Sequence, residues 1–224
     1  MSVVQVEPKP YPPAARPEPL WPAQAAILAA IALQLFLPER LTIGPTWLLP
    51  ALEALLLVGL TVASPQKIEY EHAKRRYLAL ALTAFVSLAN ATSLVLLAHF
   101  LLHHHAGNGR ELVFSGALIW LTNVLIFGLW YWQTDRGGPG QRAAGEDGPP
   151  DFQFPQMNDD RVLPREWRPQ FIDYLYLSLT NAAAFSPTDT MPLTSMAKSI
   201  MGFQSILSLV TIGLIVSRAV NILQ

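Results

Sequence analysis

The 224-residue chain contains no cysteine, and only 14% of its residues are charged. Without thiols it has no disulfides, no Cys-ligated zinc site and no thiol nucleophile. Its formal net charge of −1 excludes the basic surface typical of nucleic-acid-binding proteins. The sequence also lacks a Ser-His-Asp order, a glycine-rich phosphate loop and a His-Glu-x-x-His helix. We therefore expect no enzymatic activity, no cofactor and no nucleic-acid partner.

Apolar residues make up 51% of the chain and concentrate in five runs, which are residues 20–37, 47–63, 77–102, 112–132 and 200–222. Each run is near or above the ~17–25 residues that cross a bilayer as a helix. A very apolar soluble protein would need polar helix faces, which these runs lack. The sequence therefore predicts an all-α, polytopic helical bundle in a cell membrane, with five long transmembrane helices and the lipid bilayer as a partner.

Composition divides the chain into four segments. Residues 1–19 are proline-rich and should form a disordered or polyproline-like tail. Residues 20–132 hold four predicted transmembrane helices, and residues 133–170 form a polar linker rich in glycine and proline with little expected regular structure. Residues 171–224 hold a short helix, a turn and the last transmembrane helix.

Three polar residues lie inside the predicted spans. Glu53, in the second run, would be costly facing lipid. It either pairs with a basic group in the bundle or extends to the membrane interface, and we favour the second interpretation. Asn90 and Asn123, in the third and fourth runs, are expected to form hydrogen bonds between helices.

No metal site is expected. His103, His104 and His105 are adjacent, and imidazoles bind zinc or copper. Adjacent histidines on a helix end point in different directions, and no carboxylate pair lies near them in the sequence. A solvated helix end is the favoured interpretation.

The densest polar group near a predicted membrane-embedded turn follows the short helix. Its candidate residues are Thr180, Asn181, Phe185, Ser186, Pro187, Thr188, Asp189 and Thr190. In one interpretation Asp189 and its hydroxyl neighbours line an ion or solute pathway, because such groups are expensive to desolvate without a partner or water. In the other, residues 186–189 form a turn whose Asp caps a following helix or turn.

The segment from Tyr174 to Lys198, together with the apolar stretch that follows it to Leu223, resembles the pore helix, filter loop and inner helix of the potassium-channel superfamily. Asp189-x-x-Pro192-x-Thr194-x-x-Ala197-Lys198 matches that family's Asp-x-x-Pro-x-Thr-x-x-(Gly/Ala)-(Arg/Lys). Where the family carries Thr-Val-Gly-Tyr-Gly, residues 184–188 read Ala-Phe-Ser-Pro-Thr. A potassium filter turns successive backbone carbonyls toward one axis, and glycine adopts the required φ cheaply. The missing glycines predict a channel-like scaffold without a potassium-selective filter, and they favour the capping role for Asp189.

The whole chain is also similar to uncharacterised bacterial inner-membrane proteins called the DUF1345 family, a likeness that implies architecture rather than activity. The resemblance to channels implies ion conduction without potassium selectivity, in a homo-oligomer that would be a tetramer if channel-like. Two alternatives stay open. One is a non-conducting structural or accessory membrane subunit, and the other is a transporter that uses Asp189 as a proton or cation site.

Orientation exposes a conflict. Residues 64–76 carry four basic residues, and residues 133–170 carry five. Basic loops favour the cytoplasmic side, whereas a potassium-channel-like arrangement makes the linker before the pore helix extracellular. A short sixth crossing by residues 171–185 would return the carboxy terminus to the cytoplasm, whereas a re-entrant half-helix would not. Ser178, Thr180 and Asn181 indicate contact with protein or water in either case.

Overall fold

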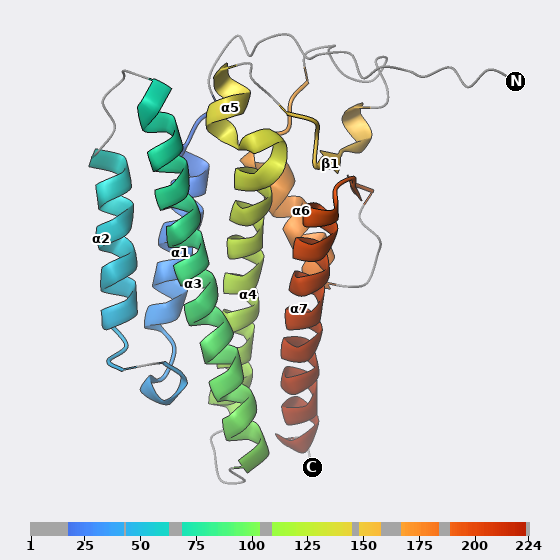
Figure 1. The fold of residues 1–224 in the computed structure, drawn as a ribbon. Helices are drawn as coiled ribbons and strands as arrows, with labels where there is room; N and C mark the ends of the chain where they lie inside the picture. Colours follow the sequence, from blue (N-terminus) through green and yellow to red (C-terminus); the bar gives the residue numbers. More distant parts are fainter. Residues whose placement is uncertain are drawn as a thin grey trace, which may run out of the picture.

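The computed structural model describes residues 18–42, 44–62, 69–103, 109–144, 148–157, 167–183 and 189–222. The predicted all-α class is confirmed (Figure 1). The α-helices are α1 (Trp21–Leu35), α2 (Leu48–Val62), α3 (Glu69–His103), α4 (Gly109–Thr134), α5 (Pro139–Ala144), α6 (Phe171–Ala183) and α7 (Ser195–Ile222). Short 3₁₀ turns cover Glu39–Leu41, Asp135–Gly137 and Pro155–Met157. Strands β1 (Phe152–Gln153) and β2 (Met191–Pro192) form one short antiparallel pair.

Three helical stretches are long and apolar enough to cross a membrane, namely Arg76–Leu101, Gly109–Gly137 and Ser195–Val220. They correspond to the third, fourth and fifth apolar runs. Helices α1 and α2 have 15 residues each. At ~1.5 Å per residue they extend about 22 Å, which is less than the ~30 Å hydrocarbon core. Within the described residues, the first two runs therefore form helices shorter than a full span.

Helix α4 is the centre of the bundle and packs against α1, α3, α6 and α7. Its side chains contribute to both hydrophobic cores, with Ile126 and Tyr131 in one and Leu112 and Ile119 in the other. Gly128 permits the closest approach to α6. A Cβ atom at that position would lie 3.2 Å from the Cα atom of Leu175. The absence of a side chain on Gly128 thus lets the backbones of α4 and α6 pack closely.

The short helix α6 runs antiparallel to α4 and does not connect the two ends of the bundle (Figure 1). In its first turn, the Tyr174 hydroxyl donates to Asp135, which directly follows α4. In its last turn, Asn181 bonds to Gln204, well along α7. Strand β2 then pairs with β1 near the end of α4, and α7 begins there. Both α6 and α7 therefore begin at the same end of α4, an arrangement that agrees with the re-entrant alternative for this segment rather than with a sixth crossing.

We call this end of the bundle the α5 end and the other the opposite end. The α5 end carries α5, β1, the starts of α6 and α7, and Glu18 (Figure 1). The opposite end carries the ion pair between Arg40 and Glu111 and the carboxy-terminal part of α7. Glu18 and the carboxy-terminal part of α7 therefore lie at different ends of the bundle.

The described parts of the two basic segments share an end. A Cβ atom on Gly138 would lie 3.9 Å from Nε of Arg76. The start of α3 is therefore close to the turn after α4. The linker is also more regular than expected, because its described residues include α5, β1 and two 3₁₀ turns. Phe152 and Phe154 anchor it, and both side chains are buried.

Candidate functional site: the junction of α4, α6 and α7

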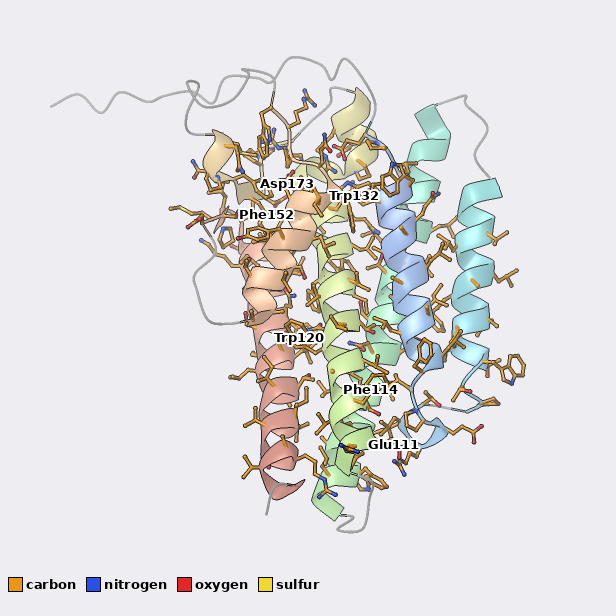
Figure 2. The ribbon with its side chains drawn as sticks, turned by 180° about the vertical axis from the view of Figure 1, so that it is seen from behind. Glu111, Phe114, Trp120, Trp132, Phe152 and Asp173 are labelled. Atoms are coloured by element: carbon orange, nitrogen blue, oxygen red, sulfur yellow. The ribbon has the colours of Figure 1, made fainter. Side chains whose placement is uncertain are left out.

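Two groups of polar residues hold the junction together. The first, which we call the ionic cluster, consists of Glu18, Asp135, Arg142, Asp151 and Tyr174. The second, the amide cluster, consists of Tyr131, Ser178, Asn181, Gln204 and Ser205. Figure 2 shows the labelled Trp132, Phe152 and Asp173 gathered near the ionic cluster's end of the bundle, with Glu111 at the opposite end.

Asp135 is the centre of the ionic cluster and is fully buried. One carboxylate oxygen accepts from the Tyr174 hydroxyl at 2.6 Å, and the other accepts from the backbone N–H of Asp151 at 2.8 Å. Burial raises the pKa of the Tyr174 hydroxyl well above its ordinary value. The phenol therefore stays protonated and remains a donor to Asp135, which fixes the start of α6 against the end of α4.

Arg142, on α5, connects the amino-terminal region to this cluster. Its Nε and Nη2 atoms bond the two carboxylate oxygens of Glu18 at 2.7 and 3.0 Å, which is a bidentate geometry. Its Nη1 atom donates to the carbonyl oxygens of Trp132 and Asp135. Glu18 also accepts from the indole N–H of Trp132 at 2.9 Å. Glu18 belongs to the segment predicted to be a disordered tail, and it is instead fixed by these bonds.

Asp151 joins the end of α4 to the start of α7. Its carboxylate accepts from the Thr194 hydroxyl at 2.6 Å and from the backbone N–H of Arg136 at 3.2 Å. The Thr194 oxygen in turn accepts from the backbone N–H of Ala197 at 3.2 Å, so Thr194 is the N-cap of α7. The capping role proposed from the sequence for Asp189 is therefore filled, at this helix, by Thr194.

The chain reverses its direction in the turn after α4, and this reversal positions α5 and Arg142. Arg136 has φ 52°, and Gly137 and Gly138 have φ 80° and 94°. Such positive values are easy for glycine and uncommon for other residues. The reversal brings α5 back over the end of α4, where Arg142 can reach the carbonyl oxygens there.

The amide cluster holds the other end of α6. The Asn181 amide donates to Gln204 Oε1 at 2.8 Å and to the Met201 carbonyl at 3.0 Å. The Gln204 amide donates to Ser178 Oγ at 2.7 Å, and Ser178 donates to the Val124 carbonyl at 2.7 Å. The Tyr131 hydroxyl also donates to Gln204 Oε1. These bonds join α4, α6 and α7 without using a charged side chain.

The predicted pore-loop residues are not all in this junction. Asn181 is in the amide cluster, whereas Thr180 bonds the Tyr176 carbonyl of its own helix. Thr190 is buried, and Asp189 is exposed with no hydrogen bond or ion pair to any other described residue. Phe185, Ser186, Pro187 and Thr188 lie outside the described residues.

The intramembrane polar candidates have different environments. Asn123 donates to Ser208 of α7 at 2.8 Å, and Asn90 donates to the Ile119 carbonyl of α4 at 3.3 Å. Glu53 is fully buried, and its Oε1 accepts from Gln34 of α1 at 3.2 Å. Glu53 pairs with no basic group among the described residues, and its side chain is not exposed on the surface of the bundle.

Sequence reasoning missed Asp135, Arg142, Asp151 and Glu18. One signal was present, since Asp135 and Arg136 come shortly after an apolar run and directly precede two glycines. That pattern indicates a charged helix end with a tight turn. Its partners could not be identified, because Glu18 and Arg142 are 124 residues apart in the sequence.

No family model, curated protein or solved structure matches this chain. The class it can be assigned to therefore comes from its own features: an all-α protein with three helices long and apolar enough to span a membrane. Between the second and third of these helices in the sequence lies the 13-residue helix α6, after which the chain returns to the α5 end. Among the described residues, no three His, Asp or Glu side chains gather as a metal ion would require.

Proposed function

We propose that this is a multi-pass protein of the cell membrane whose α4–α6–α7 unit is a pore-loop module that conducts small ions. The observation that carries the proposal is the course of α6. It has 13 residues against 26 in α4, enters between two apolar antiparallel helices, and the chain then returns to the end where it began. A half-length helix followed by a return is what a pore loop requires.

The attachment of α6 supports this role. The ionic cluster fixes its first turn and the amide cluster fixes its last turn. A loop that carries an ion pathway must be held rigidly, because its oxygen atoms have to replace part of an ion's hydration shell. Residues 184–190 are thus attached to a helix secured at both ends.

The exposed surface of α7 and of Asp189 supports assembly into a homo-oligomer. Phe203, Ile206 and Val210 are exposed on α7. In a tetramer around α7, four copies of Asp189 would form a ring of carboxylates, and such rings favour cations. Without glycines at residues 184–188, we propose that conduction does not strongly favour potassium over sodium.

Orientation is part of this proposal. Arg76, Arg136 and Arg142 lie at the α5 end, so the positive-inside rule favours a cytoplasmic location for that end. The pore loop would then open from the cytoplasmic side, opposite to the potassium-channel arrangement. The architectural likeness to the DUF1345 family remains part of the proposal as well.

A non-conducting accessory subunit is the second candidate. It is favoured by the amide cluster, whose side chains bond each other and so act as packing contacts between helices. A transporter built on Asp189 receives less support, because a coupling carboxylate is expected inside the protomer and Asp189 is exposed.

Flux through liposomes that contain the purified protein tests the proposal. We expect sodium and potassium to pass at similar rates, and Asp189→Asn to lower both. Glu39→Gln is the matched control, because Glu39 is also exposed but lies between α1 and α2. Absence of flux from correctly folded protein would favour the accessory role. A strong preference for potassium would refute the argument from the missing glycines.

A further inference from the structure

We propose that Glu53 is a proton-binding site, in which a neutral carboxylic acid is held between α1 and α2 beside Gln34. This site lies apart from the α4–α6–α7 junction and does not depend on the proposed function. It stands on burial, on hydrogen bonding and on the absence of nearby positive charge in the described part of the chain.

Glu53 is buried and has a single hydrogen-bond partner among the described residues. Glu53 has 0% of its surface exposed, although it is a carboxylic acid in an apolar helix. Gln34 of α1, itself 5% exposed, donates from Nε2 to Glu53 Oε1 at 3.2 Å. The second oxygen, Oε2, has no hydrogen-bond partner among the described residues. An ionised carboxylate would leave this oxygen charged and unsolvated.

The surroundings offer no compensating cation. Helices α1 and α2 contain no Lys, Arg or His. Near the connection between them, Arg40 is paired with Glu111 at 2.6 Å and also lies 4.7 Å from the centre of the Phe100 ring. On the adjacent part of α3, the titratable side chain is His99, which is exposed. None of these groups forms an ion pair with Glu53 among the described residues.

The free-energy cost of burying a charge favours the protonated form of Glu53. A buried carboxylate without a cationic partner costs several kcal/mol, and such groups usually become neutral instead. A carboxylic acid needs less from its surroundings: Oε1 remains an acceptor for Gln34, and Oε2 carries the proton. A metal cation would instead need several oxygen ligands. Gln34 is the one hydrogen-bonding partner found here in the described residues, so the ligand we assign is a proton.

Infrared difference spectroscopy tests this assignment on the full-length protein in lipid at neutral pH. Wild type minus Glu53→Gln should show the carbonyl stretch of a protonated carboxylic acid. Glu39→Gln is the control, and its difference spectrum should show a carboxylate band, because Glu39 is exposed. A carboxylate band in the Glu53→Gln difference would overturn the proposal.

Dicyclohexylcarbodiimide provides a second test that needs no variant. The acid proton moves to one carbodiimide nitrogen as the carboxyl oxygen bonds to the central carbon. The acyl group then migrates from that oxygen to nitrogen and gives a stable N-acylurea, whose position peptide mass mapping identifies. Modification of Glu53 at neutral pH supports the proposal. If Glu53→Gln does not fold, wild-type protein modified only at exposed carboxyls would overturn it, as would protection of Glu53 by sodium.

Discussion

The amide cluster and the α1–α2 pair bury polar side chains in opposite ways. In the cluster, Asn181 of α6 and Gln204 of α7 bond each other, and Asn181 also bonds Tyr131 of α4. In the α1–α2 pair, Glu53 has one partner and one unsatisfied oxygen within the described part of the chain. A satisfied network fixes geometry, whereas a half-satisfied carboxyl remains able to change its charge. The difference indicates a rigid mount for α6 and a separate site able to hold a proton.

The largest expected loss of stability comes from Asp135→Ala, in the ionic cluster that holds the first turn of α6. It removes the acceptor for Tyr174 and for the Asp151 backbone N–H, and it breaks the buried ion pair between Asp135 and Arg136. We expect the free energy of unfolding to fall by about 3–5 kcal/mol. Denaturation in detergent measures this, with Asp135→Asn as the milder comparison. A loss below about 0.5 kcal/mol would mean that the ionic cluster does not secure α6.

Gln204→Leu tests the amide cluster itself. It removes one hydrogen-bond partner from each of Asn181, Tyr131 and Ser178, at a buried position. Each unsatisfied group costs about 1–3 kcal/mol. Ser199→Ala is the control on the same helix, because Ser199 is exposed and bonds only its own helix. In a double-mutant cycle with Asn181→Ala, strictly additive losses would contradict a shared network.

Gly128→Val tests the close packing of α4 against α6. The new side chain would meet Leu175, whose backbone and side-chain atoms lie 3.2 Å from the position that a Cβ atom at residue 128 would take. Overpacking of this kind costs about 1–3 kcal/mol. Gly202→Ala on α7 is the matched control, because no described atom lies within 4 Å of its Cβ position. Equal thermal stabilities of the two variants would show that α6 does not pack tightly here.

The smallest effect on stability is expected from Glu53→Gln, in the α1–α2 pair. Gln has the shape of a protonated Glu and keeps an acceptor for Gln34. The change in the free energy of unfolding at neutral pH should stay within about 0.5 kcal/mol. Thermal unfolding beside wild type provides the measurement. A loss of several kcal/mol would indicate that Glu53 is charged and paired.

Hydrophobic runs predicted α3, α4 and α7 well, because long apolar stretches have few alternatives to a helix. They predicted two further full spans where the described residues form α1 and α2, helices of 15 residues each. They could not determine the direction of α6, which depends on Tyr174 reaching Asp135, 39 residues away. The sequence also ranked Asp189 first among the acids. Packing shows that Asp135 and Asp151 hold the junction, while Asp189 is exposed.

The return of α6 is the central claim, and the lack of native cysteine makes it directly measurable. Single cysteines replace Gln170, Met191 and Arg110, which are all exposed. A membrane-impermeant thiol reagent is then applied to each side of sealed vesicles. We predict that Gln170→Cys and Met191→Cys react from the same side and Arg110→Cys from the other. Reaction of Gln170→Cys and Met191→Cys from opposite sides would show that α6 crosses the membrane and would contradict the pore-loop account.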